Sequence, residues 1–171
     1  MNAFVFPGQG SQHLGMGADL YKSNQKAQQV FEDANEILGF KITDIMFGED
    51  QEALKQTDIT QPAIYIHSMV IALIAGKFFK PSAVAGHSLG EFTALAAANY
   101  ISFEDGLRLV QKRAIAMQEA CEKNESSMAA IVGLDDNIVE GVCSQSKETL
   151  VAANYNCPGQ IVISGTINAV N

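Results

Sequence analysis

The chain has 171 residues, 47% of them hydrophobic and 18% charged, so it can bury a core of the size found in one or two globular domains. Its formal net charge of −8 leaves no general basic surface for nucleic acid or an anionic membrane, although a local basic pocket for an anionic substrate stays compatible with it. The first residues lack the charged and apolar regions of an export signal, so we expect a cytoplasmic protein. The longest apolar run, Ala63–Ala75, is shorter than a membrane helix, so we expect that the protein does not span a membrane.

Strands and helices are predicted to alternate over the first 125 residues. The first three elements are a strand at Ala3–Phe6, an amphipathic helix ending at Gly39, and an apolar helix that starts at Thr60, has Pro62 in its first turn and ends at Gly76. They are followed by a strand at Ser82–Ala85 and an alanine-rich helix at Glu91–Asn99. A capping box of Ser102 and Asp105 then starts a helix that reaches about Cys121. Such alternation is typical of an α/β sheet. We therefore expect residues 1–125 to form a parallel-sheet large domain that is α/β hydrolase-like.

The pattern changes after the polar stretch Glu122–Ser126, which is predicted to be a connection. It is followed by a strand at Met128–Leu134, a helix capped by Asp135, a strand at Leu150–Asn154 and, after a turn at Pro158 and Gly159, a strand at Gln160–Ser164. This β-α-β-β order is the first part of a ferredoxin-like β-α-β-β-α-β unit, whose second helix would begin at Ile167–Asn171. We expect residues 126–171 to form an incomplete, inserted ferredoxin-like small subdomain.

The segment Gly86-His87-Ser88-Leu89-Gly90 matches the G-x-S-x-G pattern of a nucleophile elbow, a sharp strand-to-helix turn that exposes a serine hydroxyl. The pattern alone is weak, and a glycine-flanked serine in an ordinary tight turn is the alternative. Its place between a predicted strand and a predicted helix favours the elbow, because N–H groups at the helix N-terminus, that of Leu89 first, can stabilise an oxyanion. We therefore predict that Ser88 is an acyl-accepting nucleophile.

The loop Gly8-Gln9-Gly10 follows the first predicted strand. A dinucleotide or P-loop interpretation fails, because position 13 is His rather than Gly and no Gly-Lys-Ser/Thr follows. The backbone N–H of Gln9 is instead a candidate for a second oxyanion donor, since binding sites of α/β sheets gather beyond the strand ends. A purely structural turn is the alternative.

Arg113 projects toward the apolar side of its predicted helix, whereas Arg108 and Lys112 project toward the polar side. An arginine on the buried side needs an anion. A substrate carboxylate would match the guanidinium fork, and an internal Asp or Glu is the alternative.

None of the three histidines fits the general base that a serine nucleophile requires. His87 adjoins Ser88 and is expected to support the elbow, His67 lies in a core helix, and His13 lies in a loop. We expect the base outside these residues, so the chain alone should lack the catalytic histidine.

The three cysteines, Cys121, Cys143 and Cys157, are odd in number and show no metal-binding spacing, which fits a reducing cytoplasm. Cys121 and Cys143 fall on apolar helix stripes and are predicted to be buried small residues rather than nucleophiles.

Five ordered motifs resemble one family over the whole chain, the malonyl-CoA:acyl carrier protein transacylases of bacterial fatty acid synthesis and the related acyltransferase domains of polyketide synthases. The motifs are Phe6–Gln12, Thr60–Ala63, Gly86–Phe92, Lys112–Arg113 and Ala152–Gly165. The resemblance implies an enzyme that moves malonyl from malonyl-CoA to Ser88 and then to the phosphopantetheine thiol of acyl carrier protein, with no cofactor and no metal.

The same resemblance implies that the Gln9 and Leu89 N–H groups form the oxyanion hole, that Arg113 pairs with the malonyl carboxylate, and that Asn154 and Asn156 face the cleft between the domains. The family's catalytic histidine and a later glutamine have no counterpart in the chain, so a missing C-terminal segment or a companion chain is expected. Two other interpretations stay open: a serine esterase that passes the acyl group to water, and a non-catalytic fragment of a two-chain assembly.

Overall fold

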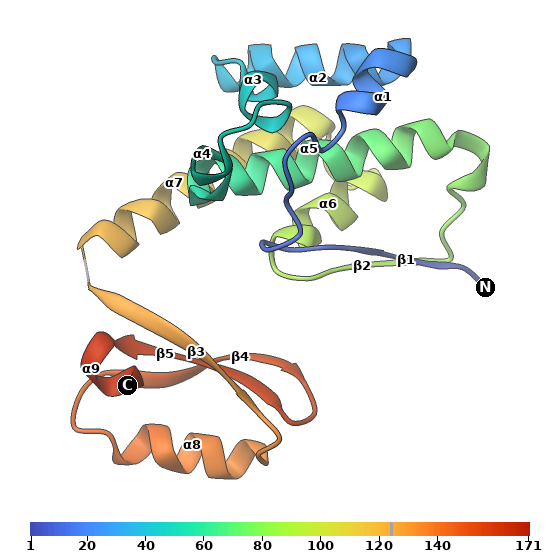
Figure 1. Cartoon of the computed structure of the whole chain (residues 1–171). Helices are drawn as coiled ribbons and strands as arrows, with labels where there is room; N and C mark the ends of the chain where they lie inside the picture. Colours follow the sequence, from blue (N-terminus) through green and yellow to red (C-terminus); the bar gives the residue numbers. More distant parts are fainter. Residues whose placement is uncertain (124) are drawn as a thin grey trace. The chain divides into compact units, whose positions relative to one another are not determined.

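The structure is a computed structural model that describes residues 1–123 and 125–171. It has an α/β fold and divides into two compact units, Met1–Gln118 and Glu119–Asn171, each of which is described by itself (Figure 1). The expected domain boundary after residue 125 stays a prediction.

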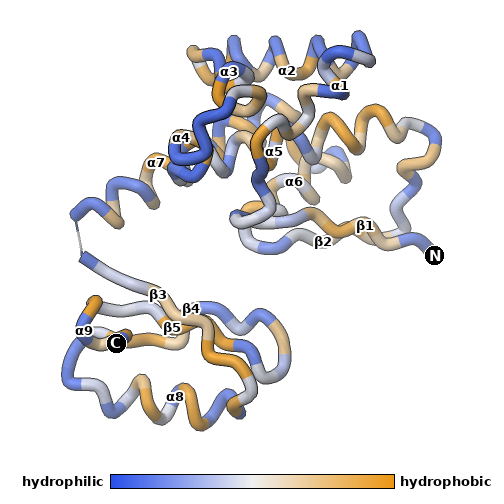
Figure 2. The backbone as a smooth tube through the Cα atoms, viewed as in Figure 1, coloured by the Kyte–Doolittle hydropathy of each residue, from blue (hydrophilic) through white to orange (hydrophobic). Residues whose placement is uncertain are grey.

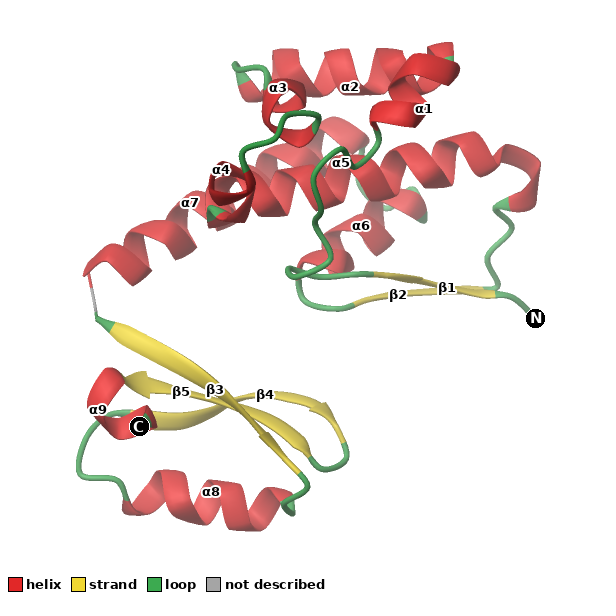
Figure 3. Ribbon diagram, in the orientation of Figure 1, coloured by secondary structure: helices red, strands yellow, loops and turns green. Residues whose placement is uncertain are grey.

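The first unit is built on two parallel strands, β1 (Ala3–Phe6) and β2 (Ala83–Gly86), which pair in register from Ala3 opposite Ala83 to Phe6 opposite Gly86 (Figure 3). Because parallel strands have their carboxyl ends at the same edge, the loop after β1 and the turn after β2 lie side by side. The His87 N–H donates a hydrogen bond to the Phe6 carbonyl at 3.0 Å, which joins the two connections. This edge holds the predicted serine.

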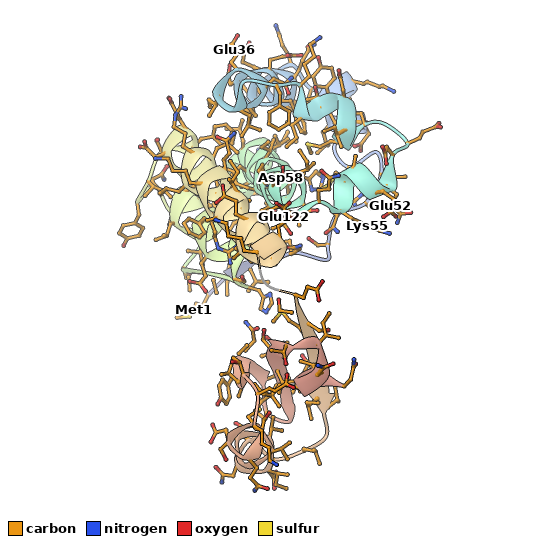
Figure 4. The ribbon with its side chains drawn as sticks, turned by 90° about the vertical axis from the view of Figure 1, so that its left-hand side faces the viewer. Met1, Glu36, Glu52, Lys55, Asp58 and Glu122 are labelled. Carbon is orange, nitrogen blue, oxygen red and sulfur yellow. The ribbon has the colours of Figure 1, made fainter. Side chains whose placement is uncertain are left out.

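Helices supply most of the core of the first unit. They are α1 (Ala18–Ser23), α2 (Gln25–Leu38), α3 (Ile42–Met46), α4 (Gln51–Lys55), α5 (Thr57–Ala75), the 3-10 turn η1 (Gly76–Phe78), α6 (Leu89–Ala97) and α7 (Phe103–Lys123). Fully buried apolar side chains from these helices, such as Phe31, Ile64 and Leu107, form one cluster, and Figure 2 colours much of α5 as hydrophobic. Charged side chains such as Glu52 and Lys55 of α4 lie outside it as an exposed ion pair (Figure 4).

The start of α5 corrects the sequence-based prediction. The helix begins at Thr57 rather than Thr60, because the N–H groups of Ile59 and Thr60 already close a turn on the Gln56 carbonyl. Pro62 therefore lies inside the helix and not in its first turn. By length and composition residues 57–78 would also suit a membrane span, but residues 59–66 are all buried, so α5 is a core helix of the first unit.

The helix α7 begins as predicted, with the Ser102 hydroxyl accepting a hydrogen bond from the Asp105 N–H at 3.0 Å. Its buried residues extend only from Gly106 to Ala114. Cys121 is exposed, so its predicted burial is wrong: the apolar stripe continues beyond the stretch of α7 that packs against described residues. The predicted connection at 122–126 includes Asn124, which lies outside the described residues.

The second unit contains the predicted β-α-β-β order. Strands β3 (Ser126–Val132), β4 (Leu150–Cys157) and β5 (Gln160–Thr166) form an antiparallel sheet in the order β3-β5-β4, with helices α8 (Asp136–Gln145) and α9 (Ile167–Val170). Cys143 is buried as predicted, together with Val139, Ile161 and Ile163. Asp135 occupies the N-cap position of α8, but its side chain accepts no capping hydrogen bond, which corrects that detail.

Candidate active site

Three glycines allow the turn around Ser88 to be as sharp as it is. A Cβ atom on Gly86 would lie 1.9 Å from the carbonyl carbon of Gly90, and one on Gly90 would lie 2.3 Å from the Phe6 oxygen. A Cβ atom on Gly8 would lie 2.7 Å from the His87 oxygen. Any side chain at these positions would therefore push apart the strand ends, the elbow and the loop after β1.

Ser88 has a backbone conformation that non-glycine residues seldom adopt, with φ 53° and ψ −105°. Such strain persists only where the surroundings hold it, and it is found mainly at functional sites. The residue is exposed and stands immediately before α6. The turn therefore has the geometry of a nucleophile elbow rather than that of an ordinary tight turn.

Two backbone N–H groups near the elbow have no hydrogen-bond acceptor among the described residues. The N–H groups of Gly90 and Glu91 donate to the His87 and Ser88 carbonyls, at 2.9 and 3.0 Å, and are thereby used within the turn. The N–H of Leu89, the first residue of α6, donates to no acceptor in the described parts of the chain, and neither does that of Gln9. The predicted donors therefore remain available to a ligand.

The guanidinium of Arg113 reaches the predicted nucleophile from α7. Its Nη2 donates a hydrogen bond to Ser88 Oγ at 2.8 Å, its Nη1 donates to Gln61 Oε1, and its Cζ lies 6.0 Å from the centre of the Phe92 ring. No carboxylate of residues 1–123 or 125–171 forms an ion pair with it, whereas Arg108 pairs with Glu104 at 2.9 Å. The internal acidic partner that the sequence left open is thus not seen among the described residues.

Gln61 is the residue of this site that sequence reasoning missed. It is fully buried in α5, with an exposed fraction of 0%, and its Nε2 lies 3.3 Å from Gln9 Oε1. Gln9, Gln61, Arg113 and Ser88 therefore form a continuous hydrogen-bonded chain drawn from four separate segments. The sign available in the sequence was a polar amide among the apolar residues of this helix, inside the motif Thr60–Ala63.

His13 and His67 belong to a different feature of the first unit. The centroids of their rings are 6.2 Å apart. Both residues line an apolar cavity of about 310 Å³ between β1 and α5, and Ser88 is not among the residues that line it. Burial lowers the pKa of His67, and the neighbouring His13 lowers it further. His87 lies with its Nδ1 2.8 Å from where a Gly8 Cβ atom would be, so its ring packs over the loop that carries Gln9.

Asn154 and Asn156 lie in β4 of the second unit and are exposed. The Asn156 Nδ2 donates to Gln160 Oε1 at 3.3 Å, and the pairing of β4 with β5 is interrupted on both sides of the stretch from Asn154 to Tyr155. Their predicted role at the Ser88 site stays a prediction. Among the described residues no group of three or more His, Cys, Asp or Glu side chains is arranged to hold a metal ion.

The fold and the elbow define an α/β protein with an exposed serine at a sharp strand-to-helix turn. Comparison with protein families gives the particular assignment: residues 3–171 match the acyl transferase domain, and the chain belongs to that family. A malonyl CoA-acyl carrier protein transacylase from Staphylococcus aureus (strain MRSA252) is 43% identical over 166 residues, covering 95% of this chain and 54% of the relative.

Two solved structures extend the comparison. An acyl carrier protein S-malonyltransferase from Vibrio cholerae has a TM-score of 0.89 at 38% identity, over 98% of this chain and 56% of the other. A malonyl-transacylase in complex with a type II PKS acyl-carrier protein has a TM-score of 0.90 at 39% identity, with the same coverage of 98% and 56%. The chain therefore spans about half the length of the relatives it matches.

Proposed function

We propose that this chain supplies the nucleophile-bearing part of a malonyl-CoA:acyl carrier protein transacylase of fatty acid biosynthesis. Ser88 Oγ attacks the thioester carbonyl of malonyl-CoA, and coenzyme A leaves as the thiol with the serine proton. The phosphopantetheine thiol of acyl carrier protein then attacks the serine ester and restores the hydroxyl. The observation that carries the proposal is the half-buried Arg113 guanidinium 2.8 Å from the strained Ser88.

The carboxylate of a malonyl ester on Ser88 lies one methylene beyond the ester carbonyl and so within reach of a guanidinium that already touches the serine oxygen. Arg113 has no acidic partner among the described residues, which leaves its charge for the substrate. A planar guanidinium suits a carboxylate better than a lysine does, because it can donate two parallel hydrogen bonds. This favours a malonyl donor over an uncharged acyl donor.

The oxyanion that forms during each transfer is proposed to accept from the N–H groups of Gln9 and Leu89. Both are without an acceptor in the described residues and lie at adjoining connections of parallel strands. Removal of one such donor from an oxyanion hole costs about 10²–10³ in rate. Because the two N–H groups belong to the backbone, their positions depend on the glycines that shape the turns as much as on the residues that carry them.

The proton acceptor is proposed to come from outside the described residues. His13 and His67 line a cavity that does not include Ser88, and His87 packs against Gly8. A histidine from the part of the relatives' length that this chain does not span would complete a Ser-His pair. The reaction then needs no metal and no cofactor, with coenzyme A entering only as the thioester substrate.

The remaining proposals concern the setting of the enzyme. The two units are proposed to be α/β hydrolase-like and ferredoxin-like in detail, which the parallel pair β1-β2 and the β-α-β-β order support. Acyl carrier protein is proposed as the partner, because one similar structure is a transacylase in complex with such a protein. A cytoplasmic location is proposed from the composition and the free cysteines.

Mass spectrometry of the full-length protein tests the proposal directly. After incubation with malonyl-CoA, the peptide that contains Ser88 should gain the mass of a malonyl ester, and addition of holo acyl carrier protein should remove it. The Ser88→Ala variant is the control and should gain nothing. An ester on another residue would overturn the proposal, and release of free malonate in place of transfer would favour the serine esterase.

A further inference from the structure

Gln61 occupies a position where an amide side chain destabilises the fold unless its polar atoms are hydrogen-bonded. It is a fully buried amide in a helix whose neighbouring residues are also buried, so its polar atoms must be hydrogen-bonded inside the protein. Oε1 accepts from Arg113 Nη1, while Nε2 lies 3.3 Å from Gln9 Oε1 and 3.3 Å from Met117 Sδ. Each polar atom of the amide is thus directed at the site.

The orientation of the Gln61 amide follows from chemistry. A guanidinium has only donors, so the atom that faces Arg113 must be the amide oxygen. The amide nitrogen must then face Gln9, whose side-chain oxygen accepts from it. Gln61 therefore connects the group that faces Ser88 to the loop whose backbone N–H is free for an oxyanion.

We propose that Gln61 is a positioning residue that gives the site its preference for an acyl group bearing a carboxylate. It holds Arg113 through Nη1, which leaves Nη2 directed at Ser88 Oγ, at 2.8 Å. The inference rests on the proposed function, because it names the residue that keeps the substrate-binding charge in place.

The neutral amide is the feature that matters. A Glu at this position would also accept from Arg113, but it would close an internal ion pair and neutralise the guanidinium. Gln61 satisfies one edge of the guanidinium while it leaves the full positive charge for a ligand. This explains why Arg113 is half-buried and hydrogen-bonded to Ser88 but forms no ion pair with any described carboxylate.

Two variants of the full-length protein test the inference, Gln61→Glu and Gln61→Met. The measurement is the rate of Ser88 ester formation with malonyl-CoA and with acetyl-CoA, determined on the same preparation by intact mass. The ratio of the two rates is independent of the folded fraction, because both substrates use the same active molecules. We expect the malonyl-to-acetyl ratio to fall about tenfold or more in Gln61→Glu, and less in Gln61→Met, which removes the hydrogen bond to a charged group but adds no charge.

The matched control is Thr60→Val, one residue away in α5. Thr60 is also fully buried, and its hydroxyl donates to the Leu54 carbonyl, so the variant loses a buried hydrogen bond without touching Arg113. It should keep the wild-type ratio. A Gln61→Glu variant whose two rates fall in parallel would overturn the positioning role. A wild-type protein that forms no malonyl ester at Ser88 would instead overturn the proposed function, and the inference with it.

Discussion

At the scale of single residues, the site combines one charge, one hydroxyl and one amide. Under the proposed function, Arg113, held by Gln61, would contact the carboxylate that distinguishes malonyl from an uncharged acyl group, because Ser88 and the backbone donors would act on the carbonyl that both share. The side chain also packs over the Phe92 ring, at 6.0 Å, in a half-buried setting where the guanidinium is partly desolvated. A loss of Arg113 should therefore affect the choice of substrate more than the chemistry.

The Arg113→Ala variant should weaken malonyl transfer by about 2–5 kcal/mol, the cost of leaving one member of a buried charge pair without its partner. Acetyl transfer should be retained or improved. Steady-state kcat/KM values with malonyl-CoA and acetyl-CoA measure both effects. Lys112→Ala is the control, since Lys112 is the exposed neighbour on the same helix and should change neither rate. Equal losses on both substrates in Arg113→Ala would contradict the carboxylate role.

At the scale of elements, the elbow depends on close packing between the ends of β1 and β2 and the start of α6. Gly90 is a point of close approach between β1 and α6, since an added Cβ atom would meet the Phe6 carbonyl oxygen at 2.3 Å and the Pro7 oxygen at 2.9 Å. Backbone atoms of a paired strand cannot move aside without loss of the sheet register.

The Gly90→Ala variant should therefore lower the free energy of unfolding by about 1–3 kcal/mol, the usual range for overpacking at a buried site. Denaturant titration of the protein measures the change. Glu91→Ala is a suitable comparison, because this exposed residue in the first turn of α6 loses only a helix-dipole interaction of less than about 1 kcal/mol. Unchanged stability of Gly90→Ala would show that the elbow is looser than these distances indicate.

The elements also show what the sequence could and could not predict. The sharp turn at Ser88 was predictable, because it follows from a local pattern of glycines between a strand and a helix. The side toward which Arg113 projects was predictable as well, because helical periodicity alone sets it. The contact of Arg113 with Gln61 joins α7 to α5 across 52 positions, so it depends on how the two helices pack. Cys121 was mispredicted for the same reason, since a helical stripe does not tell where its cover ends.

At the scale of the whole molecule, the net charge of −8 contrasts with a site built around a positive group. The acidic excess lies on exposed side chains such as Glu36 and Glu52 (Figure 4). Arg113, in contrast, is half-buried. Exposed charges are screened within about 8 Å at physiological salt, so the overall charge would hardly weaken the proposed binding of an anionic acyl group at Arg113.

The pH dependence of stability should carry the signature of His67. Desolvation by burial, and then the charge of His13, lower the pKa of His67 below its ordinary value of 6.5, whereas Asp19 raises it. The unfolded chain therefore binds a proton at this histidine more readily than the folded chain does. The full stability of the folded protein is present above the pKa of His67 in the unfolded chain. This stability decreases as the pH falls from that value through the lower pKa of His67 in the folded protein.

The free energy of unfolding should accordingly drop between pH 7.5 and pH 5, about the range in which an ordinary histidine gains its proton. In a His67→Gln variant that drop should be smaller, because no group at position 67 takes up a proton. Denaturant titrations of both proteins at the two pH values measure the difference, and the stability of the variant at pH 7.5 serves as its own reference. An equal drop in the two proteins would place the acid sensitivity in other groups, and would mean that His67 titrates alike in the folded and unfolded chains.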